Sequence, residues 1–164
     1  MRESLNPLTV VIPEKYEKTL PYAEVARFIK SLSLEENEPF SYRGVEFLLF
    51  EDSQEDGTPV EFFASTLLAG GWDIYYWSSV REAGEDFLRV LVCHEVVEVI
   101  LFKRLQTIQR LASGITDDLA LEAHNVAILY EQRFAAEIMD PKRLAEFQDF
   151  VKQFREKYRP NREL

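Results

Sequence analysis

The sequence contains one cysteine, Cys93, only two histidines, and no long apolar run. A single cysteine excludes an internal disulfide, and this fits a reducing compartment. The apolar runs are too short and too interrupted to cross a bilayer, and Met1–Pro7 lacks the apolar core of a signal peptide. We therefore expect a cytoplasmic protein without a membrane-spanning segment.

Positive charge is also scarce, because 19 Lys and Arg residues stand against 29 Asp and Glu, giving a formal net charge of -10. A field of this sign repels phosphate backbones and anionic lipid surfaces, so we expect neither a nucleic-acid partner nor a membrane partner. The G-x-G-x-x-G and P-loop motifs are absent as well. With two histidines, a Ser-His-Asp or Cys-His enzyme would have to use His94 or His124.

The 164 residues, 46% of them hydrophobic, fit a single domain over 1–164 with a sizeable core. After an irregular segment over 1–20, the periodicity predicts helices over 21–33, 85–111, 116–139 and 141–158. Residues 45–79 predict a small antiparallel sheet of about three strands, with a hairpin at Gly70-Gly71. Strands followed by helices indicate the α+β class.

The most unusual segment is the apolar stretch between Arg89 and Lys103, where 10 of 13 residues are apolar and the others are His94, Glu95 and Glu98. Its β-branched residues fit a buried strand by propensity alone, but the pattern continues without a break, which favours a helix. In a helix, His94 and Glu98 lie one turn apart on one face, with Glu95 about 100° away. Because apolar residues precede and follow them, these polar residues form an island that needs a partner.

A divalent cation is one such partner, and a buried ion pair is the other. The zinc peptidase motif H-E-x-x-H uses two histidines as ligands and the glutamate as general base. Here Glu98 replaces the second histidine, and carboxylates also bind zinc. In the ion-pair alternative, His94 or Glu98 pairs with an arginine, as is common where helices pack; the candidates are Arg104, Arg110 and Arg133.

The remaining histidine, His124, lies in the next predicted helix, seven residues before Glu131 and therefore on the same face. A short turn would make the two helices antiparallel neighbours, so His94, Glu98 and His124 would converge on one Zn²⁺. Glu95 would then accept a proton from water. Glu131 would be either a hydrogen-bonding partner of His124 or a fourth ligand that closes the site.

The segment 90–138 resembles a group of small bacterial and phage proteins. Their first helix reads roughly H-E-[LIV]-[VI]-E, and a second helix carries a histidine followed seven residues later by a glutamate. The matching residues are His94-Glu95-Val96-Val97-Glu98, and His124 with Glu131. A strand region followed by such a helix also resembles the core of zincin metallopeptidases. This resemblance implies a zincin-like fold and metal binding, although Glu98 stands where zincins have a histidine.

Two functions follow as hypotheses. The first is a zincin-like metalloprotein that hydrolyses peptides or other amides, with an edge strand within 60–79 holding an extended substrate, as the resemblance implies. The aromatic residues Trp72, Tyr75 and Trp77 would line a groove for a peptide or a small-molecule substrate. The second is a non-catalytic interaction or structural protein, whose acidic surface and C-terminal helix mediate homodimerisation or partner binding.

Overall fold

The computed structural model describes residues 10–52, 64–66, 72–110 and 117–158. The N-terminal half contains α1 (Glu14–Thr19), α2 (Tyr22–Ser31), β1 (Phe40–Tyr42), β2 (Val45–Asp52), β3 (Ala64–Thr66) and β4 (Trp72–Trp77). The C-terminal half contains α3 (Ser78–Ala83), α4 (Glu85–Arg110), α5 (Asp117–Ile138) and α6 (Pro141–Tyr158). One sheet combined with separate helices confirms the expected α+β class.

The sheet has four strands in the order β1-β2-β4-β3 and is mixed. The predicted antiparallel meander is wrong, because β2 pairs with β4 in parallel, whereas β1 and β3 are antiparallel to their neighbours. The parallel register brings Leu49 beside Ile74, and both side chains are buried in the core. In the sequence, β2 ends at Asp52 and β4 begins at Trp72, a separation long enough for the crossover that parallel pairing requires. The three-residue β3 takes the sheet edge, where a short strand exposes little unpaired backbone.

Three short elements were not predicted. The strand β1 joins β2 through Arg43 and Gly44, whose φ angles of 52° and 79° match a two-residue type I′ hairpin turn. The helix α1 lies within the segment expected to be irregular, and buries Tyr16. The helix α3 begins directly after β4, where the sequence suggested a continuing strand.

The longer helices agree with the predicted ranges to within two residues. The helix α2 extends over Tyr22–Ser31, whereas the sequence predicted a helix over 21–33. At the start of α6, Oδ1 of Asp140 accepts the Arg143 N–H at 2.8 Å, so Asp140 caps the helix as its sequence position indicates. The predicted turn between α4 and α5, residues 111–116, lies outside the described residues.

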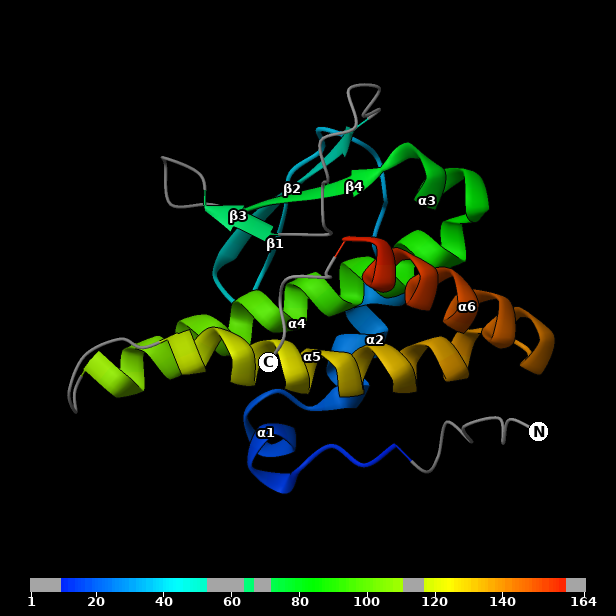
Figure 1. Cartoon of the computed structure of the whole chain (residues 1–164). Coiled ribbons are helices and arrows are strands. Elements are labelled where there is room, and N and C mark those ends of the chain that lie inside the picture. Colours follow the sequence, from blue (N-terminus) through cyan, green and yellow to red (C-terminus); the bar gives the residue numbers. More distant parts are fainter. Residues whose placement is uncertain (1–9, 53–63, 67–71, 111–116, 159–164) are drawn as a thin grey trace.

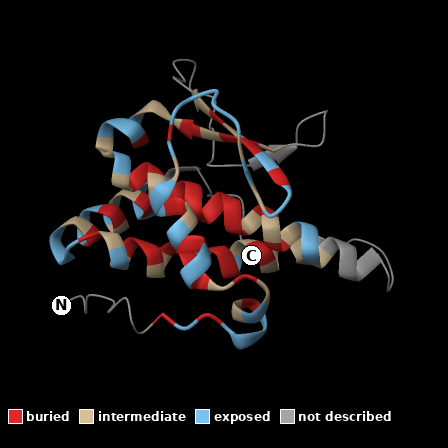
Figure 2. Ribbon diagram, turned by 180° about the vertical axis from the view of Figure 1, so that it is seen from behind, coloured by how far each residue is buried: buried red, intermediate tan, exposed pale blue. Residues whose placement is uncertain are grey.

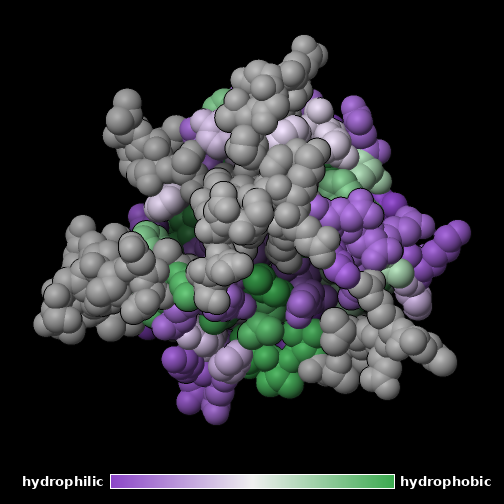
Figure 3. All heavy atoms as spheres, viewed as in Figure 1, coloured by the Kyte–Doolittle hydropathy of each residue, from purple (hydrophilic) through white to green (hydrophobic). Residues whose placement is uncertain are grey.

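The helix α4 is the centre of the molecule, with the sheet on one side and α5 on the other (Figure 1). From Phe87 to Val97, every α4 residue except Arg89 is buried, and this helix forms the red centre of Figure 2. Such burial stabilises a helix rich in β-branched residues, since packing overrides intrinsic propensity. On the face seen in Figure 3, hydrophobic residues lie over the middle of α5, with hydrophilic residues around them.

The residues at the α4–α5 interface therefore sit in the most enclosed part of the fold. No helix in the described part of the chain combines the length and the apolarity that a membrane crossing requires.

Candidate metal centre

Two residues of the site come from consecutive turns of α4. His94 and Glu98 are four residues apart and share one face of the helix. Nε2 of His94 lies 3.1 Å from Oε1 of Glu98. The side chain of His94 is 4% exposed and that of Glu98 is 24% exposed, so the pair extends from the core toward the surface.

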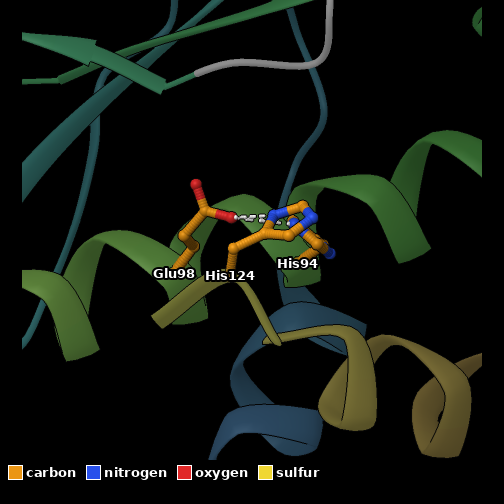
Figure 4. A group of neighbouring side chains, drawn as sticks. All are labelled: His94, Glu98 and His124. Atoms are coloured by element: carbon orange, nitrogen blue, oxygen red, sulfur yellow. Dashed lines mark hydrogen bonds and ion pairs between the residues drawn. The ribbon is translucent and has the colours of Figure 1, made fainter. Parts of the chain in front are cut away.

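The third residue, His124, comes from α5 (Figure 4). Its Nδ1 lies 2.6 Å from the same Oε1 of Glu98, and the centroids of the two imidazole rings are 5.0 Å apart. One donor atom from each of the three residues lies within 4.8 Å of the others. The two helices thus bring together the three residues that the sequence analysis selected.

Glu131 lies behind His94, on the side away from Glu98. Its Oε1 is 2.8 Å from Nδ1 of His94, and its side chain is 3% exposed. The sequence spacing linked Glu131 to His124, and the structure adds this contact with His94. Because α4 and α5 run antiparallel, Glu131 reaches the level of His94 while His124 reaches the level of Glu98. A carboxylate at Nδ1 fixes the ring orientation and directs Nε2 toward Glu98.

The contacts control the charges of His94 and Glu98. Burial opposes protonation of His94, but its hydrogen bonds with Glu131 and Glu98 outweigh burial and raise its pKa to about 10. Burial also favours the neutral form of Glu98, but its hydrogen bonds with His124 and His94 lower its pKa to about 2. Without a metal, therefore, His94 holds a proton between two carboxylates, and a cation entering the group would replace that proton.

The donor set and its spacing fit a metal ion. Two imidazole nitrogens and one carboxylate oxygen form the His₂Glu set, and tetrahedral zinc with bonds of about 2.0–2.1 Å separates its ligands by about 3.3 Å. The observed separations of 3.1 Å and 2.6 Å from Glu98 lie close to that value, and all three donor atoms lie within 4.8 Å of one another. The group could therefore hold a metal ion, with access from the partly exposed side of Glu98.

Comparison with known proteins adds no assignment. The chain matches no protein family, and neither curated proteins nor solved structures gave a significant match. The argument for this site therefore depends on its own geometry.

Glu95, the expected general base, is buried in α4 beside His94. It is not one of the three residues whose donor atoms form the described group. Its negative charge contributes to the raised pKa of His94, after burial and the Glu131 and Glu98 hydrogen bonds are counted. Glu95 is thus close enough to act on the group electrostatically without being a member of it.

The arginines of the ion-pair alternative have other positions. The guanidinium of Arg133 lies over the ring of Tyr22, at 4.3 Å from the centroid. Arg104 lines a separate cavity. The side chain of Arg110 lies outside the described residues. The ion-pair partners that the structure gives Glu98 are the two histidines.

The aromatic residues expected to line a substrate groove lie on β4. Trp72 and Trp77 are partly buried and pack against the hydrophobic core. Tyr75 stacks on Phe50 with ring centroids 5.4 Å apart, on the sheet face opposite the buried Ile74. The groove remains a prediction.

Cys93 is buried next to His94, and burial raises the pKa of its thiol. A buried neutral thiol packs like a small apolar residue, as expected from the sequence.

Proposed function

We propose that the protein binds one Zn²⁺ through His94, Glu98 and His124, and that this site hydrolyses peptide or other amide bonds. The proposal depends on one observation: Nδ1 of His124, from α5, and Nε2 of His94, from α4, both contact the same oxygen of Glu98. Two imidazoles and a carboxylate are a common zinc donor set, and their mixture of nitrogen and oxygen suits zinc better than Mg²⁺ or Ca²⁺.

The distribution of charge supports a cation at this position. Glu95 and Glu131 are buried, Glu98 is partly buried, and all three lie close enough to influence His94. Two or more ionised carboxylates in an apolar interior are unfavourable unless positive charge offsets them. Protonated His94 and His124 would each supply one positive charge, whereas a divalent cation supplies two through a single ion. A metal ion would therefore offset the carboxylates without a proton on either ligating nitrogen.

The burial gradient supports catalysis as the role of the metal. His94 and Glu131 are enclosed, while His124 is 14% exposed and Glu98 is 24% exposed. With three protein ligands, a fourth position would remain for water, as in catalytic zinc sites. Bound zinc acts as a Lewis acid and lowers the pKa of water. The carboxylate of Glu95 would accept the proton that this water loses, in agreement with the zincin resemblance.

The position of β3 supports a peptide as the substrate. This strand is at the edge of the sheet, antiparallel to β4, and it approaches α4. An extended peptide would pair by β-augmentation with β3, the last of the described strands in the sheet, and the scissile bond would then lie over α4. The aromatic groove around Trp72, Tyr75 and Trp77 is not needed for this mode of binding.

A structural role for the site is the second candidate. The contacts of His94 with Glu98 and Glu131 already connect α4 with α5 without a metal. A non-catalytic protein would retain this network to hold the two helices together. In that case His94→Ala would lower the melting temperature of the metal-free protein, and no metal would be found.

Metal content separates the two candidates. We would purify the wild type, His94→Ala and the control Asn125→Ala without a metal-affinity tag and measure zinc by elemental mass spectrometry. Asn125 is exposed and adjacent to His124, so its substitution leaves the ligands in place. We expect about one zinc per chain in the wild type and the control, and none in His94→Ala. A wild type that stays metal-free after zinc is supplied would leave only the structural role.

Hydrolysis is tested next with Glu95→Gln. We expect this variant to keep its zinc and to cleave a mixed peptide library about 100-fold or more slowly, because a general base contributes at least that factor. Loss of zinc from Glu95→Gln would instead make Glu95 a ligand. Equal cleavage by wild type and variant would remove Glu95 from the mechanism.

A further inference from the structure

The strand β4 carries a buried acidic residue, Asp73, on the face of the sheet that the metal site does not use. Along β4, Ile74 and Tyr76 are buried in the hydrophobic core, which also contains the residues of α4. Because side chains alternate along a strand, Asp73, Tyr75 and Trp77 point to the opposite face of the sheet. This face is therefore separate from the α4–α5 interface, and it combines an acidic side chain with aromatic rings.

The surroundings of Asp73 satisfy only one of its two carboxyl oxygens. The residue is 6% exposed. Its Oδ2 accepts a hydrogen bond from the Tyr75 hydroxyl at 3.2 Å, whereas Oδ1 is buried and has no hydrogen-bond partner among the residues that the structure describes. None of the ion pairs in that part of the chain includes Asp73 either. A buried carboxyl oxygen without a donor costs free energy, so Oδ1 is suited to accept from a cation or donor that binds there.

The groups beside Asp73 favour an organic cation over a metal ion. The strand register places Leu48 of β2 beside Asp73, and Phe50 beside Tyr75. The rings of Phe50 and Tyr75 are stacked, with centroids 5.4 Å apart and planes at 22°. All three neighbours are only half-buried, so this part of the face is partly open to solvent. Aromatic faces attract ammonium groups, whereas one buried carboxyl group alone supplies too few oxygen ligands for Ca²⁺ or Mg²⁺.

The spacing along the strand sets the size of the ligand. Asp73 and Tyr75 are two residues apart on one face, so their Cα atoms are separated by about 7 Å. An amine that a short chain joins to an aromatic or aliphatic group spans this distance. The formal net charge of -10 attracts cations of every kind to the protein, so a test must separate binding at Asp73 from this general field.

We propose that this face of the sheet binds a small organic amine, with its ammonium group at Oδ1 of Asp73 and its hydrocarbon or aromatic body against Leu48, Phe50 and Tyr75. The site is independent of the metal group and of the proposed hydrolysis, because its residues come from β2 and β4 alone.

The test is isothermal titration of the full chain with three probes: phenethylamine, 2-phenylethanol and methylammonium. The alcohol has the same aromatic body as phenethylamine without the charge, and methylammonium has the charge without the body. The variant Asp73→Asn keeps the shape of the side chain and removes its charge. The matched control is Glu46→Gln, which removes one charge from an exposed position of β2 on the same face of the sheet.

We expect phenethylamine to bind at least tenfold more tightly than either 2-phenylethanol or methylammonium. Asp73→Asn should weaken the binding of phenethylamine at least tenfold, and Glu46→Gln should leave it unchanged. The proposal fails if the alcohol or methylammonium binds as tightly as phenethylamine, or if phenethylamine does not bind. It also fails if both variants weaken binding equally, since that result indicates only the overall field. If Asp73→Asn did not fold, the three probes on the wild type would still decide.

Discussion

At the scale of single residues, His94 has the most constrained environment in the site. Its two ring nitrogens face two different carboxylates, Glu98 at 3.1 Å and Glu131 at 2.8 Å, and its side chain is almost fully enclosed. A neutral imidazole has one donor and one acceptor nitrogen, so a second carboxylate suits a protonated or metal-bound ring better than a neutral one. In many metal sites, one nitrogen of the imidazole binds the metal while the other donates to a carboxylate, which fixes the orientation of the ring. The two contacts of His94 follow this pattern.

The first prediction concerns Glu131. The negative charge of Glu131 orients His94 and makes its Nε2 more basic. Replacing Glu131 by glutamine keeps the shape of the side chain but removes this charge. We expect Glu131→Gln to bind zinc about 10–100-fold more weakly than the wild type, measured by competition with a fluorescent chelator. The control is Glu137→Gln, which removes a charge from the same helix at an exposed position. Equal zinc affinity in Glu131→Gln and wild type would show that Glu131 has no part in metal binding.

The second prediction concerns protons. Since hydrogen bonds with Glu131 and Glu98 overcome burial and raise the pKa of His94 to about 10, the metal-free residue is protonated at pH 7.5. Zinc binds only the deprotonated ring, so binding should release about one proton per metal ion. The affinity should therefore rise about tenfold for each unit of pH from 6 to 9.

Calorimetric titration with zinc, in buffers with different ionisation enthalpies, measures this proton release. A heat of binding that is the same in every buffer would mean that no proton leaves and that His94 is neutral before the metal arrives.

At the scale of elements, the direction of α4 is fixed where α3 ends. Gly84 separates the two helices with a φ of 146°, a conformation that side chains disfavour. Arg143 of α6 reaches this junction, donating to the carbonyl of Ala83 at 2.5 Å and to Asp86 at 2.8 Å. The Arg143 guanidinium also lowers the pKa of Asp86. Through Arg143, α6 therefore stabilises the start of α4, the helix that carries His94 and Glu98.

The third prediction tests this junction with Gly84→Ala. A Cβ at Gly84 would lie 2.2 Å from Nη2 of Arg143 and 2.6 Å from Oδ1 of Asp86, so the added methyl would displace the arginine. Backbone strain alone costs about 1–3 kcal/mol in such a region, and loss of the Arg143 contacts adds to it. Urea denaturation of the metal-free protein measures the free energy of unfolding.

Gly44→Ala is the matched control, because Gly44 has a φ of 79° but no atom within 4 Å of an added Cβ. We expect Gly84→Ala to destabilise the protein more than Gly44→Ala does. If the two losses were equal, the Arg143 contacts at the junction would be unimportant for stability.

The helices of this chain carry stronger local signals in the sequence than the strands do. The ranges of α4, α5 and α6 were predictable because their apolar residues recur at helical spacing and because caps such as Asp140 mark their ends. The pairing of the strands was not predictable, since residues 45–52 and 72–77 carry no local signal that separates parallel from antiparallel neighbours. Both β3 and β4 also contact α4, and such contacts between residues far apart in the sequence carry no local signal.

At the scale of the whole molecule, the site follows from the packing of two helices around a buried island of polarity. The residues His94, Glu98 and His124 were predictable from helical spacing and from the scarcity of histidine. The contact of Glu131 with His94 was not, because it depends on the antiparallel register of α4 and α5.

The central claim is that one metal ion lies between the donor atoms of these three residues. Crystals of the zinc-supplied wild-type protein, measured above the zinc absorption edge, would locate the metal directly by its anomalous scattering. We expect one strong peak within bonding distance of Nε2 of His94, a carboxylate oxygen of Glu98 and Nδ1 of His124. A map with no peak there, or with zinc held only by other residues, would contradict the claim and leave the cluster as a buried hydrogen-bond network.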